Sequence, residues 1–139
     1  MKRLFFLVLI ICLVALAYVI KVYNKPFEDL SKAEMKYKLS STELFTEFQD
    51  KEEAATKMYI NQPVELEGIV ESIQKNEQGI ISLSLQSGSL MGNVICELDP
   101  KVPVEESNYQ QGKLIKVRGI CTGKLLDVII SQCVIIANR

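Results

Sequence analysis

Apolar and polar residues follow one another in three successive patterns, and each pattern predicts a different kind of structure. The first is an unbroken apolar run of 17 residues from Leu4 to Ile20. The second, within residues 40–60, repeats apolar residues every three or four positions, which is typical of an amphipathic helix. The third begins at Pro63 and alternates apolar with polar residues, which is typical of β-strands.

The apolar run predicts a transmembrane helix. At about 1.5 Å per residue it would span roughly 26 Å, and the flanking Lys21 could extend the span by reaching toward the headgroups. We therefore assign residues 1–23 to a signal-anchor, with a single membrane span at residues 4–23. A cleaved signal peptide is the alternative, because Ala15-Leu16-Ala17 has the small-x-small form of a cleavage site, although the apolar run continues past it.

Charges beside the run predict its orientation. Lys2 and Arg3 hold the short N-terminus in the cytoplasm, whereas Lys21 and Lys25 are soon offset by acidic residues. The domain that follows is therefore expected outside the cytoplasm. Lipid attachment at Cys12 is disfavoured, because a bulky isoleucine precedes this cysteine where a lipobox needs glycine or alanine.

The amphipathic helix should open the folded domain, which we expect over residues 40–139. Residues 24–39 are charged and have no clean apolar period, so they are expected to form a tether. Ser40 and Glu43 have the spacing of a capping box, which predicts a helix beginning there. Its apolar stripe is expected to pack on the strands, with a groove for a partner as the alternative. The stripe consists of Leu44, Phe45, Phe48, Ala55, Met58 and Tyr59.

Five strands account for the rest of the chain. They are predicted at residues 64–73, 81–85, 93–98, 114–121 and 126–136. Gly68 interrupts the first of them, which is typical of a strongly coiled strand. Five strands grouped as three plus two predict a mainly β fold, a five-stranded Greek-key barrel of the OB type, with an SH3-like barrel as the alternative.

Composition narrows the chemistry of this domain. The chain has no histidine and no tryptophan, which excludes histidine-based catalysis, histidine metal ligation and histidine pH switching within it. Three of the 16 basic residues and none of the 17 acidic residues precede residue 25, so the rest of the chain carries an acidic excess of four. That balance disfavours nucleic-acid binding driven by overall charge.

The sequence resembles the tRNA-anti-like OB-fold family from about Leu39 to Ala137. The helix ends in the Ala-x-x-x-Tyr pattern of that family and leads to a first strand with a central glycine, at Ala55, Tyr59 and Gly68. A later G-x-x-V-x-V-x-G-x-C-x-G signature is matched by Gly112, Val117, Gly119, Cys121 and Gly123, with Ile115 at the earlier valine, and is followed by Asp127, Val128 and Cys133. The sequence departs from the family pattern at Asp50-Lys51-Glu52, where an asparagine is common.

The resemblance implies an OB fold in a membrane-tethered or exported bacterial protein. We accordingly expect a single-pass protein of the bacterial inner membrane, with its C-terminal domain facing the periplasm or the exterior. The resemblance concerns the fold, and it does not imply that tRNA is the ligand. We expect a binding or scaffold module without catalytic activity or cofactor, whose ligand is a protein, a glycan or a small molecule.

Nucleic-acid binding is the alternative function, because many OB folds stack bases on aromatic residues and follow phosphates with basic ones. The second and third predicted strands, however, contain no aromatic residue, and Tyr109 in a loop is the only one after residue 60. The one basic cluster, expected on the fourth strand and the turn after it, consists of Lys113, Lys116, Arg118 and Lys124. We regard it as a candidate ligand-binding patch, although a solvated strand face explains it more simply.

No catalytic or metal site is predicted. The three cysteines of the domain have no histidine to activate them and form no C-x-x-C pair. In an oxidising compartment one disulfide could form. Cys121 and Cys133 are expected far apart along their hairpin, whereas Cys96 and Cys133 lie on strands that neighbour each other in an OB barrel, so we expect this second pair.

Overall fold

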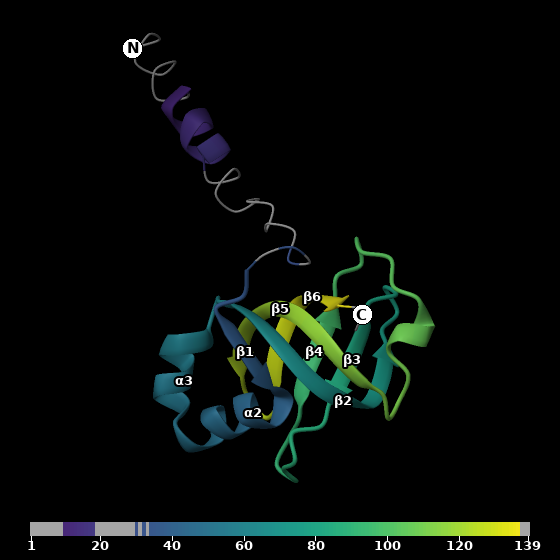
Figure 1. The fold of residues 1–139 in the computed structure, drawn as a ribbon. Helices are drawn as coiled ribbons and strands as arrows, with labels where there is room; N and C mark the ends of the chain where they lie inside the picture. The colour runs from purple at the N-terminus through teal and green to yellow at the C-terminus, as the bar shows by residue number, and fades with distance from the viewer. Residues whose placement is uncertain (1–9, 19–29, 31, 33, 137–139) are drawn as a thin grey trace.

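The computed structural model describes residues 10–18, 30, 32 and 34–136 (Figure 1). Residues 10–18 are helical. The rest of the predicted membrane span and half of the predicted tether lie outside the described residues. Within the part of the chain that is described, no helix is both long enough and apolar enough to cross a bilayer.

Five strands close into a barrel. They are β2 (Pro63–Lys75), β3 (Ile81–Leu85), β4 (Val94–Leu98), β5 (Leu114–Lys124) and β6 (Val128–Ile136). Their order is β2-β3-β4-β6-β5, and β5 pairs back onto β2. Only β4 and β6 pair in parallel within this ring, while the other neighbours are antiparallel. This connectivity is that of an OB barrel, so the predicted barrel is confirmed and the SH3-like alternative is wrong.

The long first strand of the barrel makes closure possible because it pairs with two partners in succession. Residues 63–69 of β2 pair with β5, and residues 70–75 pair with β3, with a register shift between Val70 and Ser72. Gly68 lies at this changeover. A Cβ atom there would come within 2.5 Å of Ser41 Oγ and 3.2 Å of Leu85 Cβ. The glycine is therefore needed for close packing of the helical segment on the coiled strand.

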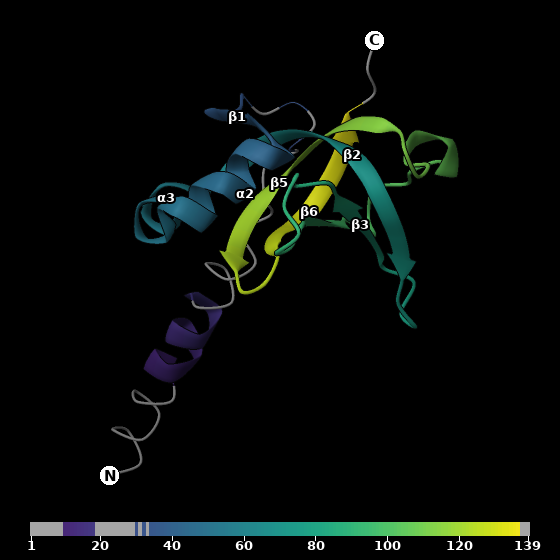
Figure 2. The same ribbon diagram turned by 90° about the horizontal axis from the view of Figure 1, so that it is seen from below.

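The predicted single amphipathic helix is two helices, α2 (Ser41–Asp50) and α3 (Glu52–Tyr59), which lie along one side of the barrel (Figure 2). The capping box is confirmed, because Glu43 N donates to Ser40 Oγ and Ser40 N donates to Glu43 Oε2. Lys51 has non-helical dihedral angles and separates the helices. An unbroken helix over this segment would run straight for about 28 Å, whereas the break lets both apolar faces wrap onto the barrel.

An additional strand, β1 (Tyr37–Ser40), precedes α2 and pairs in parallel with residues 64–67 of β2. The sequence interpretation placed its first three residues in the tether, so the folded domain begins earlier than expected. Leu30 and Met35 are also buried, against Ile120 and Val134 on the outside of the barrel. The strand forms here because β2 turns to β3 only from Val70 onward, which leaves one edge of its first half open.

A single apolar core fills the barrel and the space beneath the helices. The stripe predicted for the helix contributes Leu44, Phe45, Phe48, Ala55 and Tyr59, all buried. Met58, predicted for the same stripe, is instead 46% exposed. The break at Lys51 turns α3 so that Ala55 and Tyr59 face the core and Met58 faces outward.

Candidate functional site

The predicted basic patch is divided among internal interactions. Arg118 Nε lies 2.8 Å from Glu65 Oε2, and both side chains are largely buried. Lys116 Nζ lies 3.3 Å from Glu67 Oε2 in a more exposed pair. Both pairs follow from the β2–β5 register, which places Glu65 opposite Arg118 and Glu67 opposite Lys116. These two cations are therefore already balanced by carboxylates on the neighbouring strand.

The other two members of the patch contact different parts of the domain. Lys113 Nζ donates to the Ser107 carbonyl at 2.7 Å. Lys124 Nζ donates to the Phe48 carbonyl at 3.4 Å and lies 5.4 Å from the centre of the Phe45 ring, so it fastens α2 to the end of β5. The structure thus brings Lys116 and Arg118 together on one sheet face but does not assemble all four residues into one surface.

The outer face of β3 and β4 is the surface on which many OB folds bind their ligands. Here it carries Ser82 paired with Glu97 and Ser84 paired with Ile95. None of these side chains is aromatic or basic. Tyr109, the single aromatic residue after residue 60, is buried in the core, and this burial raises its pKa. No base-stacking platform is present on this face.

The cysteines of the domain are buried free thiols. Burial raises the pKa of Cys121 to about 11 and that of Cys133 well above its usual value, and the adjoining Cys96 thiol raises the latter further. A thiol with a raised pKa is a poor nucleophile near neutral pH. Cys96 is opposite Ile130 in the β4–β6 ladder and Cys133 is opposite Leu98, so the predicted disulfide partners are diagonal neighbours. That disulfide stays a prediction.

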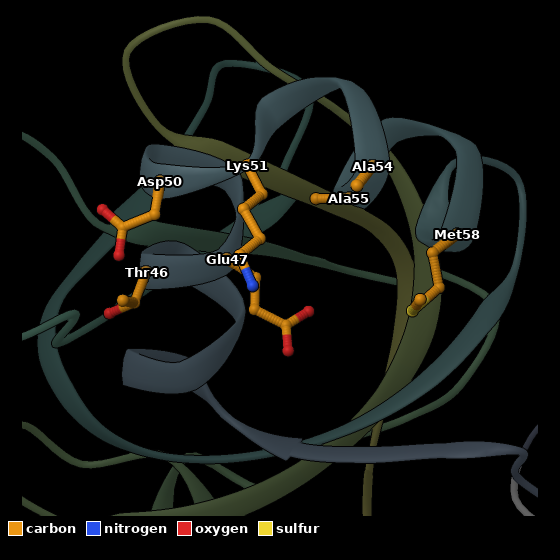
Figure 3. Close-up of a pocket in the computed structure, with 7 residues that line it drawn as sticks. All are labelled: Thr46, Glu47, Asp50, Lys51, Ala54, Ala55 and Met58. Atoms are coloured by element: carbon orange, nitrogen blue, oxygen red, sulfur yellow. The ribbon is translucent and has the colours of Figure 1, made fainter.

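A hollow of about 470 Å³ opens where α2 meets α3 (Figure 3). Ala54, Ala55 and Met58 line its apolar side, and Glu47 and Lys51 are directed toward the same opening. Thr46 and Asp50 form another part of the rim. Glu47 is held in place by Tyr59, whose hydroxyl donates a hydrogen bond to Glu47 Oε2 at 2.5 Å. Burial and this hydrogen bond raise the pKa of Tyr59, so the donor stays protonated.

A second exposed feature is an apolar tip at one end of the barrel, formed by the β3–β4 loop and the β5–β6 turn. Leu90 and Leu125 at this tip are almost fully exposed, and Met91 and Leu126 beside them are about two-thirds exposed. We call these four residues the apolar tip. Nothing in the described part of the chain covers them.

Backbone contacts hold the two segments of the apolar tip together. Asn93 N donates to Asp127 Oδ1 at 2.7 Å, and Val128 N donates to the Asn93 carbonyl at 3.0 Å. A Cβ atom on Gly92 would lie 2.5 Å from the Leu126 carbonyl oxygen, so glycine allows the loop and the turn to touch. The four apolar side chains therefore belong to one connected surface rather than to two independent loops.

Sequence reasoning found neither the hollow nor the apolar tip. The hollow depends on the angle between α2 and α3, and the sequence pattern predicted a single helix in their place. The tip had a local signal, because Leu90-Met91 and Leu125-Leu126 are apolar pairs inside predicted turns. From these pairs the sequence could have predicted exposed apolar side chains in each turn. It could not have predicted that the two turns lie next to each other.

Among the described residues, no group of three or more histidine, cysteine, aspartate or glutamate side chains is arranged to hold a metal ion. The hollow and the apolar tip are two candidate binding surfaces, whereas the two cations on the sheet face of β5, Lys116 and Arg118, are paired with carboxylates.

Comparison with known proteins places this arrangement in a family. A solved structure from Klebsiella pneumoniae, titled "putative nucleic acid-binding lipoprotein", matches with a TM-score of 0.62 and 11% sequence identity, over 79% of this chain and 98% of that one. At that identity the likeness concerns the fold. No curated protein matches the sequence. The family model described as tRNA_anti-like matches residues 1–135, and the chain belongs to this family of OB-fold proteins.

Proposed function

We propose that this protein is a membrane-anchored, extracytoplasmic OB-fold module that binds a protein ligand and has no catalytic activity. The apolar tip carries the proposal. Large exposed apolar side chains that gather on one surface of a domain are typical of sites that bind a partner. Four such side chains on two loops that are joined by backbone hydrogen bonds form a defined surface at the end of a closed barrel.

The proposed anchor rests on the apolar run from Leu4 to Ile20 and on the basic residues before it. The Klebsiella structure with the same fold is titled a lipoprotein, which supports an envelope location for this type of domain. In the present chain the apolar run would anchor the domain to the membrane, as a covalently attached lipid does in a lipoprotein. The domain it holds begins by residue 37, where β1 starts.

The chemistry of the domain supports binding without catalysis. The chain contains no histidine, and Cys121 and Cys133 are buried with raised pKa values. The exposed carboxylates Glu67 and Glu53 are engaged in ion pairs with lysines. An active site needs a nucleophile, acid or base whose pKa is tuned toward neutrality within a concave site, and these groups do not meet that need.

The proposal is tested by capture of partners from native membranes with tagged full-length protein. The variant Leu90→Ser/Leu125→Ser removes the two most exposed side chains of the apolar tip. A matched control, Ile73→Ser/Leu114→Ser, removes two partly exposed apolar side chains elsewhere on the barrel. A protein that is retained by the wild type and the control but lost from the tip variant supports the proposal. Equal retention by all three proteins contradicts it.

Binding of single-stranded nucleic acid is the second candidate function, and one observation favours it. The Klebsiella neighbour is titled as a nucleic acid-binding protein. Binding through Lys116 and Arg118, the two cations that share a sheet face, would compete with their pairs with Glu67 and Glu65. That competition makes protein binding the better supported function.

A further inference from the structure

We propose that the hollow between α2 and α3 is a second binding site, which receives the long cationic side chain of an arginine or lysine from a protein partner. This inference rests on the proposed function only in taking a protein as the ligand. It depends on different residues from those of the apolar tip.

The size and lining of the hollow allow a long side chain to enter it. Its volume of about 470 Å³ is within the range of roughly 300 to 1,000 Å³ that is usual for ligand pockets. Ala54 and Ala55 have side chains that end at Cβ, which leaves space between the two helices, and Met58 forms an exposed apolar wall. The methylene stem of an arginine or lysine could lie along these three residues while its charged end remains at the rim.

The charge of the surroundings fits a cation. Residues 41–59, which contain both helices, include five acidic and two basic residues. Glu47 and Asp50 line the hollow, and neither forms an ion pair within the described part of the chain. By contrast, Glu65 and Glu67 on the barrel are paired with basic residues of β5. Lys51 is the one basic residue that lines the hollow, so the hollow retains a net negative charge next to its apolar side.

Glu47 is already positioned for a cation. The Tyr59 hydroxyl donates to its Oε2 atom at 2.5 Å, which fixes the carboxylate without neutralising it. A carboxylate can accept several hydrogen bonds, so Glu47 can still accept one from a guanidinium or ammonium group. Because Tyr59 holds the side chain in one orientation, less conformational entropy is lost when a ligand binds.

Lys51 is the internal competitor of such a ligand. Figure 3 shows its side chain directed over the opening beside Glu47. It has no ion pair within the described residues, so a cation with a better fit could replace it near the carboxylate. Removal of this lysine should therefore tighten binding of a cationic partner.

The test uses full-length protein in detergent and a fluorescein-labelled nonapeptide that alternates leucine with arginine, measured by fluorescence anisotropy. Glu47→Gln/Asp50→Asn should weaken binding by roughly five- to tenfold. Lys51→Ala should strengthen it by about twofold. The same peptide with citrulline in place of arginine has nearly the same shape without the charge, and it should not bind measurably.

The control variant is Glu52→Gln/Glu53→Gln, which removes the same amount of charge from exposed positions that do not line the hollow. It should change the affinity by less than twofold. Equal weakening by both variants would show general charge attraction and would overturn the inference, as would binding of the citrulline peptide. The Leu90→Ser/Leu125→Ser variant should bind the arginine peptide like the wild type. Loss of peptide binding only in that variant would assign cation binding to the apolar tip and overturn the assignment to the hollow.

Glu47→Gln can also weaken the contact with Tyr59, so the fold of each variant is checked by its urea unfolding midpoint. Asp50 is exposed, so Asp50→Asn alone keeps the test valid if the double variant is unstable. In that case a loss of roughly twofold in affinity supports the inference, and unchanged affinity overturns it.

Discussion

The hydroxyl of Tyr59 at the end of α3 donates a hydrogen bond to Glu47 in the middle of α2, at 2.5 Å. This contact joins the two helices across the break at Lys51. The Tyr59 ring also lies 5.1 Å from the ring of Tyr37 on β1 and 6.1 Å from that of Phe48 on α2. Tyr59 therefore connects three successive elements, and its spacing from Ala55 places both residues on the buried face of α3.

Truncation of Tyr59 should destabilise the domain. Tyr59→Ala removes a ring that is almost completely buried and should lower the free energy of unfolding by about 2 to 4 kcal/mol. Tyr59→Phe keeps the ring but removes the hydrogen bond to Glu47, and should cost about 1 kcal/mol. Urea unfolding of both variants measures the two contributions. A cost below about 0.5 kcal/mol for Tyr59→Ala would contradict the packing described here.

The domain should lose stability at alkaline pH, partly through Tyr59. Burial, followed by the hydrogen bond to Glu47, raises the pKa of Tyr59 above its ordinary value of 10.0. In the unfolded chain this tyrosine ionises near its ordinary pKa, whereas in the folded domain it stays protonated. Its contribution to stability is therefore complete below about pH 10 and is lost as the pH rises above that value.

The comparison that isolates this effect is between the wild type and Tyr59→Phe. The pKa of Tyr109 is also raised by burial, but its effect on the pH dependence of stability is the same in both proteins and cancels in the comparison. Denaturant unfolding between about pH 9 and pH 11 should show a smaller loss of stability in Tyr59→Phe than in the wild type. Parallel pH profiles would show that Tyr59 ionises equally easily in both states.

Local sequence signals predicted local structure well. The capping box at Ser40 was confirmed because all its partners lie within four residues of one another. Each predicted strand is present, with ends that differ by at most a few residues, since alternation and turn residues are also local signals. The barrel follows from five such strands and the resemblance to the family.

Features that depend on tertiary contacts were not predicted. β1 pairs along the edge that β2 leaves open, and the alternation of apolar and polar residues in its sequence, Tyr37–Ser40, is only four residues long. The pairing of Arg118 with Glu65 spans 53 residues and depends on the register between two strands. Without that register, Arg118 was grouped with three lysines as a candidate patch.

Gly68 should be intolerant of even a methyl group. A Cβ atom at this position would meet the Ser41 hydroxyl at 2.5 Å, and that hydroxyl donates to the Gln86 carbonyl. Gly68→Ala should therefore destabilise the domain by about 1 to 3 kcal/mol through overpacking. Ser72→Ala on the same strand is the control and should change stability by less than about 0.5 kcal/mol. Equal effects of the two substitutions would show that α2 can move away from the strand.

The two ion pairs on β5 should differ in their contribution to stability. Arg118→Met leaves the buried Glu65 carboxylate without its partner and should cost about 3 kcal/mol. Lys116→Met breaks the more exposed pair with Glu67 and should cost less than about 1 kcal/mol. The double variant Arg118→Met/Glu65→Met should recover most of the loss, because no buried charge is then left unpaired. Thermal or urea unfolding of the wild type, the two single variants and the double variant measures these differences in stability.

The domain should not bind single-stranded nucleic acid with useful affinity. An OB fold that does so needs basic contacts that release counterions and aromatic faces worth about 1 to 3 kcal/mol per stacked base. The four residues of the basic patch are each engaged within the domain, and the outer face of β3 and β4 carries no aromatic side chain. We expect no saturable binding of a fluorescent oligonucleotide of about 12 nucleotides, DNA or RNA, at micromolar protein and ~0.15 M salt.

A variant without the two carboxylates on β2 distinguishes two reasons for a lack of binding. The domain either has too few basic residues on this face, or it has basic residues whose charge is balanced by carboxylates. Glu65→Gln/Glu67→Gln removes the carboxylate partners of Arg118 and Lys116 on one sheet face. If pairing is what suppresses binding, this variant should show weak and strongly salt-dependent affinity that the wild type does not show. Sub-micromolar affinity of the wild type, with a steep salt dependence that disappears in Lys116→Ala/Arg118→Met, would instead locate a nucleic-acid site on β5. The proposal of a protein ligand would then be wrong.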